Sequence, residues 1–61
     1  PDPRFYELFF QTFSIDPAHA IYIDDLLPNV EAARAFGMHG ILFTDPAALR
    51  HELVNIGFIT G

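Results

Sequence analysis

The stretch AIYIDDLLPNVEAARAFGMHGILF, residues 20–43, decides the fold. It contains two continuous apolar runs, residues 20–23 and 40–43, which are typical of strands buried on both faces of a parallel sheet. Between them a Pro-Asn pair precedes Val30–Phe36, and Gly37 follows; this order is typical of a helix. The stretch therefore predicts strand, helix, strand, joined by a parallel crossover.

Two further helices are predicted, one on each side of this unit. Residues 3–13 carry apolar side chains at helical spacing behind Asp2, which suits the capping position. Residues 46–56 do so behind Asp45, and Gly57 can end that helix. The sequence thus predicts an α/β fold, the αβαβα part of a doubly wound parallel sheet.

Length and composition suggest that this part belongs to something larger. The chain has 61 residues, 51% of them hydrophobic, and no cysteine, so a disulfide framework is excluded. It offers two strands, whereas sheets typically have about 4 to 6. We therefore expect a piece of a larger domain. The alternative is self-association of two copies through the exposed strand edges.

The net negative charge of the chain limits the kinds of molecule that it is expected to bind. Three basic and eight acidic residues give a net charge of -5 and a pI near 4.7, which disfavours nucleic acid and anionic membranes. A cation is easier to accommodate. No apolar run approaches the roughly 18 residues of a membrane span, and no secretory signal is present in the chain. These features predict a cytoplasmic protein with neither a nucleic acid nor a membrane as partner.

Two adjacent acids, Asp24 and Asp25, follow the first predicted strand. Ligands of open parallel sheets gather at the carboxyl ends of the strands, and adjacent carboxylates repel each other unless a cation neutralises them. Mg²⁺ prefers oxygen ligands and takes one or two carboxylates, with water or substrate phosphate in its other positions. The pair is equally compatible with a solvated acidic loop, in which one carboxylate caps the following helix.

The residues also carry a resemblance. The opening PDPRFYE and the later IYIDDLLPNVEAARAFGMHGILF resemble the C-terminal part of the haloacid dehalogenase-like (HAD) hydrolase superfamily, from Pro1 to about Leu53. Within it the chain is most similar to small sugar-phosphate phosphatases and to the phosphatase domain fused to some epoxide hydrolases. The resemblance implies that residues 1–61 are a C-terminal fragment of a Rossmann-like HAD core domain, with no cap domain present.

The resemblance also assigns roles to residues. Asp24 and Asp25 match the acidic motif that holds magnesium, and Asp25 is the stronger candidate for direct ligation. Asn29 matches a position that supports the metal site from behind the ligands. The family's aspartate nucleophile, its general acid, its phosphate-binding hydroxyl and its lysine would all precede Pro1. We therefore expect no catalytic residue within the chain itself.

The implied function is hydrolysis of small phosphomonoesters by the complete protein, through an aspartyl-phosphate and with Mg²⁺ as cofactor. The chain alone is expected to be inactive, which leaves open whether it is an enzyme by itself. One alternative is a haloacid dehalogenase-type hydrolase, although that family has serine and asparagine where this chain has IDD. Another is a non-catalytic interaction or dimerisation module. A receiver-type signalling domain is disfavoured, because its acidic pair lies near the start of the domain.

Overall fold

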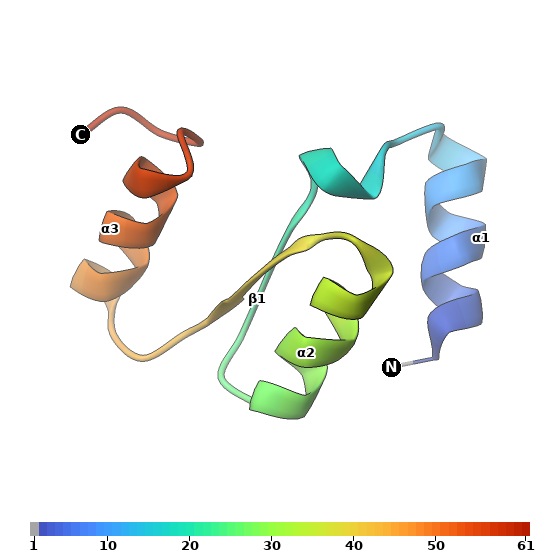
Figure 1. The fold of residues 1–61 in the computed structure, drawn as a ribbon, viewed down its shortest axis with the longest axis horizontal. Helices are drawn as coiled ribbons and strands as arrows, with labels where there is room; N and C mark the ends of the chain where they lie inside the picture. Colours follow the sequence, from blue (N-terminus) through green and yellow to red (C-terminus); the bar gives the residue numbers. More distant parts are fainter. Residues whose placement is uncertain (1) are drawn as a thin grey trace.

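The computed structural model describes residues 2–61 and contains the five predicted elements in the predicted order, plus one short helix (Figure 1). Pro1, which opens the PDPR segment, lies outside the described residues. None of the helices in this part of the chain is long and apolar enough to cross a bilayer. The elements are α1 (Pro3–Phe13), the 3-10 helix η1 (Pro17–His19), β1 (Ile21–Asp24), α2 (Leu27–Phe36), β2 (His39–Leu42) and α3 (Pro46–Asn55).

The two strands form a parallel pair, which confirms the predicted crossover and the α/β class. Ile21 lies opposite His39, and the register continues to Asp24 opposite Leu42. Each strand is shifted by one residue from its predicted range, β1 toward the C-terminus and β2 toward the N-terminus. Asp24 is therefore the last residue of β1, and the strand pleat sets the direction of its side chain.

The core lies on the sheet face that α1 and α2 cover. Tyr6 and Phe10 of α1 pack against Ala33 of α2 and against Met38 in the turn that follows. Phe36 joins them, with its ring centroid 5.5 Å from that of Tyr6 and 5.7 Å from that of Phe10. Ala33 has no exposed surface, because the small side chain lets the helix approach its neighbours closely. Aromatic packing thus fixes α1 and α2 relative to the sheet.

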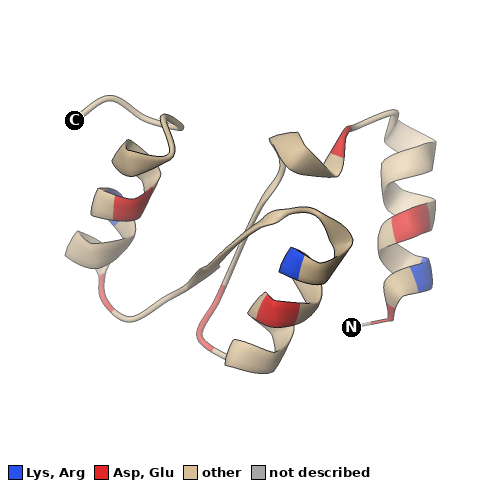
Figure 2. Ribbon diagram, viewed as in Figure 1, with Lys and Arg blue, Asp and Glu red and all other residues tan. Residues whose placement is uncertain are grey.

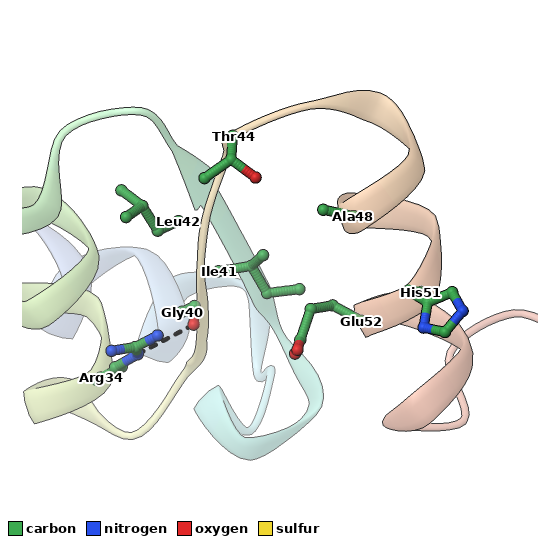
Figure 3. Close-up of a pocket in the computed structure, with 8 residues that line it drawn as sticks. All are labelled: Arg34, Gly40, Ile41, Leu42, Thr44, Ala48, His51 and Glu52. Carbon is green, nitrogen blue, oxygen red and sulfur yellow. Dashed lines mark hydrogen bonds between the residues drawn. The ribbon is translucent and has the colours of Figure 1, made fainter.

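The opposite sheet face is only partly covered, so the prediction that both strands are buried on both faces was wrong for this chain. Ile23 of β1 is 43% exposed, whereas Ile41, opposite it on β2, is 6% exposed. Ile41 points toward α3 (Figure 3), but α3 fully buries none of its own residues. Within residues 2–61, α3 leaves this face of β1 partly uncovered, and Ile23 stays exposed.

Local chemistry sets most of the helix ends. The carboxylates of Asp2 and Asp45 accept hydrogen bonds from backbone N–H groups in the first turns of α1 and α3, as predicted. Gly37 ends α2 with φ of 108°, a left-handed conformation that glycine adopts readily. The start of α2 differs from the prediction: the helix begins at Leu27, because Pro28 fits its first turn without needing an N–H partner. No side chain caps α2.

Candidate functional site at the carboxyl end of β1

The three predicted site residues lie together at the turn from β1 to α2. Asp24 ends β1, Asp25 follows it, and Asn29 lies in the first turns of α2. Figure 2 shows the acidic turn as a short red segment between β1 and α2, with no basic residue on it. The structure therefore places the acids at the sheet edge where ligands of open parallel sheets bind.

The Asp24 carboxylate is held by three donors from three different places. Its Oδ1 accepts a hydrogen bond of 2.9 Å from the Leu26 backbone N–H, in the turn itself. Its Oδ2 accepts one of 3.0 Å from Asn29 Nδ2 on α2 and one of 2.9 Å from the Tyr22 hydroxyl on β1. These bonds, that of Asn29 first, lower the pKa of Asp24 from 3.8 to about 2. Asp24 is thus fixed in direction and in its charged form.

Asn29 bonds Asp24, and its predicted role in supporting a metal site stays a prediction. Its amide donates a hydrogen bond to Asp24, and the side chain is partly buried. An amide at this position can donate to a carboxylate without adding charge to the site. Asn29 therefore orients Asp24 from the first turns of α2.

Tyr22 belongs to the site, and the sequence reasoning missed it because the residue lies in an apolar strand. Alternate residues of a strand point to the same face, so Tyr22 and Asp24 were bound to be neighbours. That two-residue spacing was the available signal. The hydrogen bond to Asp24, which the hydroxyl can donate only while it is protonated, and partial burial together raise the pKa of Tyr22 to about 12. The negative charge of Asp24 acts in the same direction.

Asp25 differs from its neighbour. Its side chain is exposed and, within residues 2–61, accepts no hydrogen bond from a donor group, although it lies close enough to the Asp24 carboxyl to lower the pKa of that group. Asp24 does not cap α2, because its backbone partner Leu26 precedes the first helical residue and α2 has no side-chain cap. The helix-capping alternative therefore does not describe this turn, and Asp25 is the carboxylate left available to a ligand.

The donor set suits a hard cation only in part. Within the described range 2–61, no group of three or more His, Asp or Glu side chains could hold a metal ion. Two neighbouring carboxylates are nevertheless what Mg²⁺ usually takes from a protein, with water and phosphate oxygens completing its octahedron. The residues fit one side of a magnesium site. The assignment of Asp25 and Asp24 as ligands stays a prediction.

A separate hollow lies between β2 and α3 (Figure 3). Its volume is about 500 Å³, and its lining includes Arg34, His51 and Glu52. Arg34 Nε donates a hydrogen bond of 3.0 Å to the Gly40 carbonyl there. None of the three predicted site residues lines this hollow. It follows the outer side of β2, where the described chain has no further strand, and we do not assign the chemistry to it.

Comparison with known proteins gives relatives over most of the chain. No family model matches the sequence. A sesquiterpene phosphatase of Aspergillus oryzae is 43% identical over 53 residues, which are 87% of this chain and 27% of the relative. Mouse acyl-CoA dehydrogenase family member 10 is 40% identical over 53 residues, 87% of this chain and 5% of the relative. An Arabidopsis thaliana flavin mononucleotide hydrolase is 35% identical over 57 residues, 93% of this chain and 23% of the relative.

The same segment also matches the bifunctional epoxide hydrolases 2 of rat and pig, each over 56 residues. These matches confirm the predicted similarity to phosphatases and to epoxide hydrolases. The chain spans at most 27% of the length of the relatives it matches. The similarity therefore covers one segment of each relative and not its whole activity.

Proposed function

This chain belongs to the haloacid dehalogenase-like (HAD) hydrolase superfamily, and on that premise we propose that it is the C-terminal part of a magnesium-dependent phosphatase. The proposed substrates are small phosphomonoesters. Two relatives are named for related chemistry, one a sesquiterpene phosphatase and the other a flavin mononucleotide hydrolase. The nucleophile, general acid and lysine would come from the part of the full-length protein that corresponds to the unmatched length of these relatives.

The observation that carries the proposal is the unequal use of two adjacent carboxylates. Asp24 accepts hydrogen bonds from three donors, whereas Asp25 is exposed at the carboxyl end of β1 and accepts none from a donor group within residues 2–61. Asp25 would hold the magnesium ion directly, and Asp24 would keep the turn in shape and add negative potential beside it. A bound magnesium ion would stabilise the charge on the transferring phosphoryl group.

The sequence left two alternatives, and each meets a specific difficulty. The acidic pair disfavours a haloacid dehalogenase-type reaction, because the resemblance places serine and asparagine there in dehalogenases. An interaction or dimerisation module would pair through a strand edge. The His39 N–H donates to β1, and backbone groups of successive strand residues point to opposite sides, so those of Gly40 point to the outer edge of β2. There the Gly40 carbonyl already accepts a hydrogen bond from Arg34. This bond from Arg34, a residue of α2, leaves one fewer acceptor on the β2 edge for pairing with another strand.

The test is hydrolysis by the full-length protein. We expect turnover of p-nitrophenyl phosphate that stops when EDTA is added and returns with excess Mg²⁺. Turnover that is unaffected by the chelator, or release of halide from a haloacid in place of phosphate release, would contradict the proposal.

A second measurement concerns the 61 residues alone, which we expect to hydrolyse no p-nitrophenyl phosphate with Mg²⁺ present. Without an aspartate nucleophile positioned opposite Asp25, the chain could bind a cation but could not form the phosphoenzyme. Turnover by the isolated chain that Asp25→Asn abolishes would show that the nucleophile lies within residues 1–61.

A further inference from the structure

Tyr22 joins the aromatic core to the acidic turn. Its ring belongs to the sheet face covered by α1, where it packs against the buried core cluster. Its hydroxyl lies at the other end of the ring and donates to Asp24 Oδ2 at 2.9 Å. One side chain thus contacts both the packed interior and a carboxylate of the candidate site.

The ring of Tyr22 is itself held in place. Its centroid lies 6.3 Å from that of Tyr6 with the planes at 84°, the edge-to-face arrangement that aromatic pairs favour. Tyr6 is 7% exposed and packs against Phe36 of α2. The position of the Tyr22 hydroxyl therefore depends on α1 and α2 together, rather than on the turn that carries the acids.

A carboxylate needs such support, because rotation of the Asp carboxyl about its last bond is soft and has no sharp preferred angle. Leu26 N–H and Asn29 Nδ2 both come from the turn and helix that follow Asp24. Tyr22 is the donor that precedes Asp24 in the chain and that is anchored in the core. Without its hydroxyl, Oδ2 would keep only the Asn29 bond, and the carboxylate could turn with the loop.

We infer that Tyr22 is a positioning residue of the proposed magnesium site: it fixes Asp24 from the core side, so that the turn presents Asp25 to the ion. The inference rests on the proposed function, since it assumes that a cation binds here. The inference goes beyond that function by giving the aromatic core a role in metal affinity, through the ring and hydroxyl of Tyr22. Groups of this kind, which hold ligands without touching the metal, commonly affect metal affinity by about 10 to 100-fold.

The experiment compares Tyr22→Phe with Tyr6→Phe in the full-length protein. Both variants remove one phenol hydroxyl from the same aromatic cluster and keep the ring. The Tyr6 hydroxyl lies near that of Tyr22, but only Tyr22 bonds Asp24, so Tyr6→Phe tests whether loss of the neighbouring hydroxyl alone is enough to change the affinity. Isothermal titration calorimetry gives the Kd for Mg²⁺, and p-nitrophenyl phosphate turnover gives kcat, KM and the Mg²⁺ concentration for half-maximal activity. We expect Tyr22→Phe to raise the Kd by about 10-fold and Tyr6→Phe to stay within about twofold of wild type.

Saturating Mg²⁺ should restore most of kcat in Tyr22→Phe, with the substrate KM unchanged, because the ligands themselves are intact. A wild-type Kd in Tyr22→Phe would overturn the inference while leaving the proposed function standing. An equal loss of affinity in Tyr6→Phe would also overturn it, since the effect would then come from general packing. A wild-type protein that binds no Mg²⁺ would contradict the proposed function, and the inference would fail with it.

Discussion

The carboxyl ends of β1 and β2 begin alike and then diverge. Each strand leads into an acidic turn, a proline and a helix. After β2, the Asp45 carboxylate accepts a hydrogen bond of 2.9 Å from the Ala48 N–H and so caps α3. After β1, the Asp24 carboxylate bonds the Leu26 N–H ahead of the helix, and α2 has no side-chain cap. One strand end uses its acid for helix stability, whereas the other keeps two acids at the sheet edge.

The helices compensate in opposite ways. A missing cap usually costs a helix about 0.5 to 2 kcal/mol. α2 tolerates this because Val30 and Ala33 are fully buried, whereas the capped α3 fully buries none of its residues. Packing thus supports the helix beside the candidate site, and local hydrogen bonding supports the other. Breaking a local rule where the rest of the fold compensates is expected at functional sites.

The largest expected effect is on activity, from Asp25→Asn in the full-length protein. Removal of the exposed acid of the pair, which we propose as the direct metal ligand, should lower kcat/KM for a phosphomonoester by at least about 100-fold, because the cation loses its ligand. The matched control is Asp45→Asn, at the end of the other strand, which should keep nearly full activity. Steady-state kinetics on both variants is the measurement. If the two variants were equally impaired, the proposed functional difference between the ends of β1 and β2 would be contradicted.

The next effect concerns Asn29. Asn29→Ala removes the amide that contributes most to holding the pKa of Asp24 low, so this pKa should rise toward its ordinary value. We expect Mg²⁺ affinity to fall by about 10-fold, because the variant loses the hydrogen bond to Asp24 but keeps Asp25, the proposed ligand. Asn55→Ala, at the exposed end of α3, is the control. Calorimetric titration should show a change in the first variant only.

A smaller effect is expected at the β2 end, this time on stability. Asp45→Ala removes the bond to the Ala48 N–H and should lower the free energy of unfolding by about 1 kcal/mol. Phosphatase activity at a temperature well below the unfolding transition should not change. Chemical denaturation of the full-length protein measures the first quantity. A loss of activity in the fully folded variant would mean that this strand end also serves the site.

The smallest effect is a dependence of stability on pH. The pKa of Asp24 is lowered to about 2 in the folded chain, from an ordinary value of 3.8. Such a group stabilises the folded state above its unfolded pKa, and this contribution is lost as the pH falls through the folded pKa. Between about pH 4 and pH 2, wild type should therefore lose stability more steeply than Asp24→Asn. Thermal unfolding across this range is the check, and equal slopes would contradict the network around Asp24.

Much of the fold could be predicted from local signals. The strand-helix-strand order followed from two apolar runs, and the caps at Asp2 and Asp45 followed from short polar residues ahead of prolines. The start of α2 was predicted too late in the chain. The helix begins at Leu27, but Leu26, at the capping position, has no side chain that signals a helix start. The burial of β1 was overestimated, because a continuous apolar run predicts cover on both faces of a strand, whereas Ile23 is 43% exposed.

The sequence predicted where the candidate site lies, but not which of its two carboxylates would accept hydrogen bonds from the protein. The position of Asp24 and Asp25 at the sheet edge followed from strand direction, and Asn29 was added because of the resemblance to the HAD superfamily. The three hydrogen bonds to Asp24 come from β1, from the turn and from α2, so they form only when these three parts are folded together. Tyr22 could have been found from its two-residue spacing to Asp24, but an apolar run predicts packing and not donation.

The most direct test of this account is a crystal structure of the full-length protein with Mg²⁺ bound. We expect the ion at about 2.1 Å from an Asp25 carboxylate oxygen, with Asp24 Oδ2 still bonded to Tyr22 and Asn29. An ion bound elsewhere in the protein, with the Asp25 side chain turned to solvent, would contradict the claim that the unengaged acid at the end of β1 is the metal ligand.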